Sequence, residues 1–179
     1  MQESLDTLAT RLDSSRNYEA PPLHLWHPEL SGDIPIYIDA QGDWYHDGTR
    51  IERESLVRLF ASILRREEDG EYYLLTPAEK WRIKVERHAL LVTDISSQGE
   101  GDAQRLVATL NTGRQLPVSA EHPLFLDDTA EQVAALCLPH GLTALCTRAA
   151  WYRLVELAQL RDGYAVLTSG DYEFRLPLA

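Results

Sequence analysis

The sequence is poor in the residues that mark secreted proteins and nucleic-acid-binding proteins. It contains only two cysteines, Cys137 and Cys146, which excludes a framework of several disulfides and fits a reducing cytoplasm. It has 17 basic residues against 28 acidic residues, for a formal net charge of −11. Nucleic acids and anionic membrane surfaces both need a positive footprint on their protein partner, so we expect neither as a partner.

Long apolar runs are also absent from the sequence. No stretch approaches the ~18 apolar residues of a membrane span, and the first residues do not read as a signal peptide. We therefore expect no membrane span and a cytoplasmic location. The glycine-rich phosphate loop, the Gly-x-Ser-x-Gly elbow and the His-Glu-x-x-His motif are missing as well, so no cofactor is indicated.

What the sequence does contain is an internal repeat. Each half has, in the same order, a proline-led strand ending in Asp, a glycine, an arginine-bearing helix, an Asp-Gly turn and a second strand. The first copy runs from Pro35 to Thr76, and the second runs from Pro123 to Thr168. A repeat of this length indicates two similar supersecondary units and not a solenoid of short repeats.

Hydrophobic periodicity predicts helices at residues 3–13, 52–66 and 147–160, with Thr147 as the N-cap of the last one. Strands precede and follow each of the two longer helices, and the turns are too short for repeated βαβ crossovers. The predicted fold class is α+β, with two structurally similar repeats, each a mostly antiparallel sheet packed with one main helix.

The domain organisation follows from the repeat and from a change in composition. The stretch Ser96–Asp102 is rich in serine, glycine and acidic residues, so it is the expected join between the halves. We expect an N-terminal helix and leading loop at residues 1–33, a first repeat at residues 34–96 and a second repeat at residues 97–179, together forming one compact unit.

Charge is unevenly distributed along the chain, and this favours a ligand site in the first repeat. Residues 50–87 hold nine basic and eight acidic residues, whereas the remainder is strongly acidic. An anionic ligand can approach this stretch without crossing a repulsive field. The candidate ligand-binding residues are Trp44, Arg53, Thr76, Glu79 and Lys80.

Each part of this candidate site also has a structural alternative. Arg53 stands at a helix start, where free N–H groups bind anions, but it can equally pair with Asp39. The same choice applies to Arg148 and Asp127 in the second repeat. The turn at 76–80 can converge on a ligand, or it can be an ordinary type I turn with a solvated Glu-Lys pair.

Two further groups of residues suggest chemistry. His46 lies beside Asp47 and is a candidate general base, although a solvated hairpin tip explains it as well. Cys137, His140 and Cys146 are zinc-ligand types, but the set is incomplete and the cysteines have apolar neighbours. Structural zinc needs four ligands, so we expect buried thiols and no metal.

The run from Asp43 to Glu86 resembles a bacterial family catalogued as domain of unknown function 1285. The resemblance is carried above all by Asp69-Gly70-Glu71-Tyr72-Tyr73-Leu74-Leu75-Thr76-Pro77-Ala78-Glu79-Lys80, and it continues at His122-Pro123-Leu124 and Gly141-Leu142-Thr143-Ala144. It implies a bacterial, compact α+β protein with a repeated structural motif. It implies no established activity, cofactor or catalytic residue.

Taken together, these patterns predict a cytoplasmic bacterial protein that binds a small anionic ligand or a protein partner in a sensing or regulatory role. The alternative is a hydrolytic or transfer enzyme that uses His46 with a nearby carboxylate.

Overall fold

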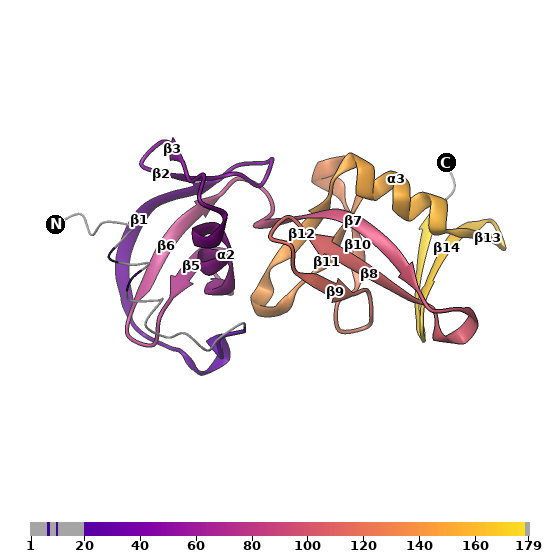
Figure 1. Ribbon diagram of the computed structural model, residues 1–179, viewed down its shortest axis with the longest axis horizontal. Coiled ribbons are helices and arrows are strands. Elements are labelled where there is room, and N and C mark those ends of the chain that lie inside the picture. Colours follow the sequence, from indigo (N-terminus) through magenta and orange to yellow (C-terminus); the bar gives the residue numbers. More distant parts are fainter. Residues whose placement is uncertain (1–6, 8–9, 11–19, 178–179) are drawn as a thin grey trace. The chain divides into compact units, whose positions relative to one another are not determined.

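The computed structural model describes residues 7, 10 and 20–177, and it divides into two compact units, Met1–Arg87 and His88–Ala179 (Figure 1). Each unit contains a six-stranded, mostly antiparallel sheet and one main helix, which confirms the predicted α+β class and the two similar repeats. Apart from Thr7 and Thr10, which are helical, the helix predicted at residues 3–13 lies outside the described residues.

The boundary between the units does not lie in the acidic, serine-rich stretch. Strand β7 (Leu90–Gln98) continues through Ser96, and it pairs with β8 (Arg105–Leu110) across a tight connection. Ser96–Asp102 is therefore part of a hairpin inside the second unit. Its turn-forming residues connect the two paired strands β7 and β8 and do not form a linker between the units.

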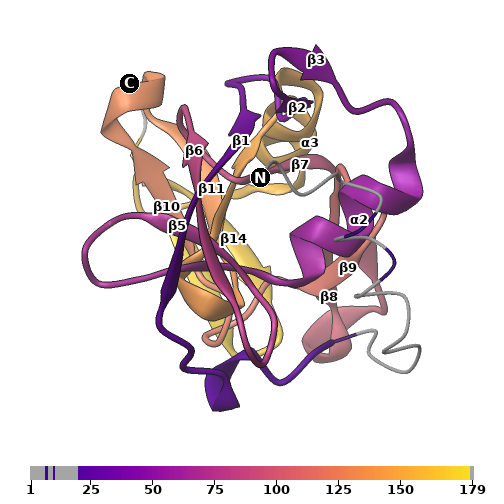
Figure 2. The ribbon, with the colours of Figure 1, turned by 90° about the vertical axis from the view of Figure 1, so that its left-hand side faces the viewer.

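The sheet of the first unit consists of two three-stranded meanders. Their inner strands, β1 and β6, run parallel and join the meanders, while all the other pairs are antiparallel. Figure 2, in which the first unit faces the viewer, shows β1 and β6 side by side with α2 beside the sheet. The strands are β1 (Leu30–Ile38), β2 (Trp44–His46), β3 (Thr49–Arg50), β4 (Leu64–Arg66), β5 (Tyr72–Leu75) and β6 (Lys80–Val85).

The second unit repeats this topology. Its strand order is β10-β11-β12-β7-β8-β9, and β12 and β7 form the parallel pair. In topology β7 therefore corresponds to β1, whereas the sequence repeat aligned the residues of β1 with those of β10. The remaining strands of this sheet are β9 (Gln115–Pro117), β10 (Leu124–Asp127), β11 (Val133–Cys137) and β12 (Thr143–Cys146).

The helices occupy different places in the two units. Helix α2 (Glu54–Ser62) connects the two meanders of the first unit, whereas α3 (Arg148–Leu157) follows both meanders of the second. The Thr147 hydroxyl accepts a hydrogen bond from the Ala150 N–H at 3.3 Å, as expected for an N-cap. After α3, a separate three-stranded sheet contains β13 (Gln159–Arg161), β14 (Tyr164–Ser169) and β15 (Tyr172–Pro177).

The core of the first unit lies between α2 and one face of its sheet. The Phe60 ring of α2 stacks on the Trp44 ring of β2 with their centroids 6.2 Å apart. Burying a side chain of this size stabilises the fold by about 1.5–3 kcal/mol. The strands contribute Ile36, Ile38 and Ile83, all fully or almost fully buried. Residues that alternate with these three project from the opposite face of the sheet.

Candidate functional site

The pairing of β1 with β6 is interrupted around Pro35. Asp33 lies opposite Arg82 and Tyr37 lies opposite Lys84. The three residues between them on β1, Ile34–Ile36, therefore face a single residue of β6, Ile83. The extra residues form an irregularity of the β-bulge kind, which bends a strand and redirects its side chains. The bulge is held on its other side, because the Pro35 carbonyl accepts a hydrogen bond from the Asp47 N–H at 2.8 Å.

A hollow of about 700 Å³, here called the bulge pocket, lies at this irregularity. Its volume falls within the range of small-molecule sites. Its lining combines apolar residues, here called the apolar wall, with charged ones. The pocket is lined by residues 33–37 of β1, by Asp47 and Gly48 of the turn after β2, by Glu71 and by residues 82–84 of β6.

The charged residues of the bulge pocket fall into two groups. Asp33 and Arg82 neutralise each other through an ion pair of 2.7 Å, and the hydrogen bond from Arg82 lowers the pKa of Asp33. Lys84, Asp47 and Glu71 form no hydrogen bond or ion pair through their side chains within the described part of the chain. The pocket thus presents one cation and two carboxylates whose charges are available to a ligand.

Tyr37 supplies an aromatic side to the pocket, and its position is fixed. The Tyr37 hydroxyl donates a hydrogen bond to Glu86 at 2.7 Å, which raises the pKa of Tyr37. Glu86 also accepts from the Ala40 N–H at 2.8 Å, so the carboxylate is itself anchored to the backbone. Tyr37 is 38% exposed and its ring contacts that of Tyr45, so part of the Tyr37 side chain stays open to a ligand.

The five residues predicted from the sequence do not form one cluster, and none of them is among the described residues that line the bulge pocket. Trp44 is 1% exposed and belongs to the core. Arg53 is the exposed N-cap residue of α2. The Thr76 hydroxyl accepts from the N–H groups of Ala78 and Glu79 at 3.3 and 3.0 Å, so it stabilises its own turn. Their role in ligand binding stays a prediction.

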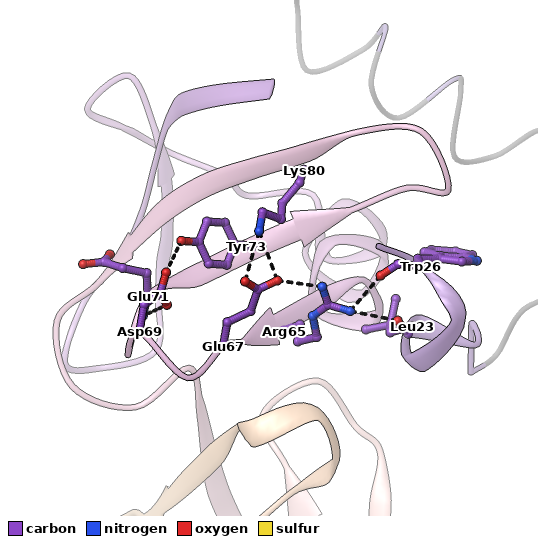
Figure 3. A network of polar contacts seen from close by, with 8 residues as sticks. All are labelled: Leu23, Trp26, Arg65, Glu67, Asp69, Glu71, Tyr73 and Lys80. Atoms are coloured by element: carbon purple, nitrogen blue, oxygen red, sulfur yellow. Dashed lines mark hydrogen bonds and ion pairs between the residues drawn. The ribbon is translucent and has the colours of Figure 1, made fainter. Parts of the chain in front are cut away.

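Lys80 belongs to a network of polar contacts at the β4–β5 edge of the first sheet (Figure 3). Its Nζ lies 3.0 and 3.3 Å from the two carboxylate oxygens of Glu67. Arg65 donates to the same carboxylate at 2.6 Å. A second nitrogen of Arg65 donates to the carbonyls of Leu23 and Trp26, each at 2.9 Å. The network therefore attaches the leading segment to β4.

The same network includes Tyr73 and Asp69. The Lys80 ammonium lies 4.5 Å from the centre of the Tyr73 ring, and the Tyr73 hydroxyl donates to Asp69 at 2.5 Å. This hydrogen bond raises the pKa of Tyr73 to about 12 and lowers that of Asp69. Burial opposes ionisation of Glu67, but hydrogen bonds from Arg65 and Lys80 outweigh it and lower the Glu67 pKa. Lys80 thus already has an ion pair with Glu67, whose carboxylate it shares with Arg65.

His46 is half-buried, and its Nε2 atom has no hydrogen-bond partner among the described residues. A general base needs a hydrogen bond that orients its ring, and in an enzyme a carboxylate often provides it. No hydrogen bond joins His46 to Asp47 within the described structure. Asp47 therefore does not orient the His46 ring among the described residues, and the enzyme alternative stays a prediction.

A second buried network, in the second unit, was not predicted. His88, 8% exposed, lies 2.7 Å from the Thr143 hydroxyl and 2.5 Å from the Asp127 carboxylate. Burial opposes ionisation of Asp127, but hydrogen bonds from Thr129 and His88 outweigh it and lower its pKa to about 2. His88 is far from both partners in sequence, so no local pattern could reveal the contact.

The proposed pairing of Arg148 with Asp127 is not formed. Arg148 instead donates to the Tyr152 hydroxyl, one turn further along α3, at 3.2 and 3.3 Å. The carboxylate of Asp127 is occupied by His88 and Thr129. Asp39, which the sequence repeat aligned with Asp127, accepts from the N–H groups of Gln41 and Asp43.

Metal-ligand types do not gather in the part of the chain that the structure describes, where no three His, Cys, Asp or Glu residues are placed to hold an ion. Cys146 is buried, and burial raises the pKa of its thiol to about 12. Within the same residues, no helix has the length and apolar character needed to cross a membrane.

Comparison with known proteins gives a family but no activity. Residues 21–88 match the model described as domain of unknown function (DUF1285), N-terminal domain, and residues 89–176 match the model of its C-terminal domain. No curated protein matches the chain.

Two solved structures are similar to this chain, and both are described as DUF1285 family proteins. The protein from Silicibacter pomeroyi DSS-3 is 33% identical, with a TM-score of 0.83 over 99% of this chain and 96% of that one. The protein from Shewanella baltica OS155 is 31% identical, with a TM-score of 0.56 over 69% of this chain and 91% of that one.

Proposed function

We propose that this chain, which belongs to the DUF1285 family, binds a small ligand with an anionic group in the bulge pocket of its first unit. In this proposal the protein has a sensing or regulatory role in the cytoplasm. The site lies in the same repeat as the one expected from the sequence, but it uses Lys84 and not Lys80 as the cation that meets the ligand.

The observation that carries the proposal is the state of Lys84. Lys84 lines a hollow, and its ammonium group has no hydrogen bond or ion pair to any residue that the structure describes. Lys80, by contrast, is bound to Glu67. A charge-assisted hydrogen bond from Lys84 to a ligand anion is stronger than a hydrogen bond between neutral groups. The apolar wall, which includes Pro35, can bury the uncharged part of the ligand.

The composition of the pocket favours binding over catalysis. Its lining includes no serine, threonine, cysteine or histidine among the described residues. A covalent or proton-transfer mechanism needs a nucleophile or base held within reach of another catalytic group. Two carboxylates and a lysine without such an arrangement are suited to recognising a ligand.

The test is a thermal-shift screen of small carboxylates and phosphates against the full chain and three variants. A ligand at 100 times its dissociation constant should add about 2.7 kcal/mol of stability. We expect Lys84→Gln to lose most of the shift and Arg58→Gln, which removes another exposed cation, to keep it. Arg53→Ala tests the residue predicted from the sequence.

Two results would contradict the proposal. The first is a full shift in Lys84→Gln with every ligand found. The second is a shift that is lost in Arg53→Ala while the melting temperature without ligand is unchanged. The second result would locate the site at the start of α2.

A further inference from the structure

We infer that the ligand of the bulge pocket is a zwitterion, whose anionic group meets Lys84 and whose ammonium group meets one of the two carboxylates on either side of Lys84, Asp47 or Glu71. This inference rests on the proposed function and specifies its ligand class. Free amino acids and short peptides share this chemistry.

The charge balance inside the pocket carries the first step. Asp33 and Arg82 neutralise each other at 2.7 Å. What remains is one cation, Lys84, and two carboxylates, Asp47 and Glu71, all without a hydrogen bond or ion pair from their side chains among the described residues. A ligand with only a negative charge would be attracted by Lys84 and repelled by the two acids. A ligand with an added ammonium group is attracted by all three.

The positions of these residues fit a ligand that lies across β1. Lys84 lies beside Tyr37 on the β6 side of the strand, and Asp47 is bonded to Pro35 on the β2 side. Two strand spacings separate them, about 10 Å between backbones, and both residues line the hollow. The two ends of a small zwitterion can therefore reach one group each.

Glu71 approaches Lys84 from the other neighbouring strand. It directly precedes Tyr72, which pairs with Ile83, so Glu71 lies next to Lys84 in the continued register. The two side chains line the same hollow without forming an ion pair. Lys84 therefore lies between the two acids, and the ammonium group of a zwitterion held by Lys84 can reach either Glu71 or Asp47.

The apolar wall determines which kind of side chain the ligand carries. Ile34, Pro35 and Tyr37 line the hollow together with the charged groups. The Tyr37 face can contact an apolar side chain, and it also attracts a cation placed above it. We therefore expect apolar amino acids or peptides of apolar residues to bind better than acidic ones.

The experiment measures binding of the standard L-amino acids and of Leu-Leu to the full chain by calorimetry. The tightest ligand is then compared with its N-acetyl derivative, which has only the anion, and with its amide, which has only the cation. We expect both derivatives to bind at least about tenfold more weakly than the zwitterion. A free amino acid that binds better than Leu-Leu identifies amino acids as the source, and the reverse identifies peptides.

Variants of the protein test the contacts of the ammonium group and of the anionic group separately. Asp47→Asn combined with Glu71→Gln should weaken the zwitterion at least about tenfold and should not weaken the N-acetyl derivative, because the two repelling charges are removed. Lys84→Gln should weaken both ligands. Glu68→Gln removes an exposed carboxylate outside the pocket and is the control. Asparagine tolerates the left-handed backbone of Asp47, which has a φ of 50°, so the double variant should fold.

Three results overturn the inference, and they bear differently on the proposed function. If the N-acetyl derivative binds as tightly as the free ligand, the acids play no part and only the anion site stands. If carboxylates or phosphates bind and no amino acid or peptide does, the same conclusion follows. If no anion of any kind depends on Lys84, both the inference and the proposed function fail.

Discussion

Glu67 is the residue on which the polar network of the first unit depends. Its carboxylate binds both Arg65 and Lys80, and the side chains of all three are only 14–24% exposed. Removing one partner from such a group leaves part-buried charges without compensation. We expect Glu67→Gln to lower the free energy of unfolding by about 2 kcal/mol, less than for a fully buried pair because solvent screens the charges.

Glu68 provides the matched control for that prediction. It is the exposed neighbour of Glu67 and makes no side-chain hydrogen bond within the described residues. Urea denaturation followed by tryptophan fluorescence should show Glu68→Gln within about 0.5 kcal/mol of the natural protein. Equal effects of the two substitutions would mean that the network contributes nothing to stability.

Asp127 gives a prediction about acid stability. Its pKa is about 2 in the folded protein against an ordinary value of 3.8, so the unfolded chain binds its proton first. The stability that Asp127 contributes is therefore complete above pH 4 and is lost as the pH falls towards 2. We expect Asp127→Asn to cost on the order of 2 kcal/mol at pH 7 and almost nothing at pH 2.

The measurement is the difference in unfolding free energy between Asp127→Asn and the natural protein across this pH range. Asp171→Asn removes an exposed carboxylate in the β14–β15 turn, so it controls for net charge. A difference that stays constant from pH 7 to pH 2 would show that the Asp127 side chain stabilises the unit by some means other than its charge.

At the residue scale, the sequence reveals contacts between neighbours and hides those between distant residues. Thr147 was predicted as an N-cap because the cap and the N–H that it binds are three residues apart. His88 meets Asp127 and Thr143 across intervals of 39 and 55 residues. The available charge of Lys84 is equally hidden, because the sequence does not show that Glu67 binds Lys80 and leaves Lys84 without a partner.

At the scale of elements, the Thr147 cap decides how firmly α3 begins. Its hydroxyl satisfies one of the free N–H groups in the first turn of the helix, at Ala150. We expect Thr147→Ala to destabilise the second unit by about 1 kcal/mol and Thr147→Ser to restore most of the loss. Circular dichroism during urea unfolding measures both. A serine variant as unstable as the alanine variant would show that the methyl group matters and the cap does not.

Periodicity predicted where the helices begin better than where they end. Leu64 follows Phe60 at helical spacing, so the pattern extended the helix to residue 66. In the structure Leu64 pairs with Leu74 in an antiparallel hairpin, and the helix ends at Ser62. A strand partner several residues away overrides local spacing. The bulge at Pro35 was missed for the same reason, since it exists only relative to β6.

At the scale of the whole molecule, both six-stranded sheets share one arrangement of meanders and a parallel central pair. The sequence repeat predicted two similar units, but it aligned β1 with β10 because both strands carry Pro and Asp. The pairing of strands aligns β1 with β7. Short motifs can match at turns and strand ends wherever these occur, so they report element types more reliably than topological position.

Protein fragments can distinguish the two candidate boundaries between the units, one before His88 and one before Ser97. Every pairing of β7, with β8 and with β12, lies within the second unit, and each unit is large enough to hold a core of its own. We expect residues 88–179 to unfold cooperatively in urea and to give dispersed amide signals in NMR. Residues 97–179, which follow the boundary expected from the sequence, should do neither.

The reason for this difference is the place of β7 in its sheet. The shorter fragment lacks residues 90–96, which contain the whole interface with β12 and buried Leu90, Val92 and Ile95. Without them the two meanders have no strand to join them, and the buried face of β12 is exposed to water. Cooperative unfolding of the shorter fragment would place the boundary after β7. Failure of both fragments would mean that the second unit depends on residues before His88.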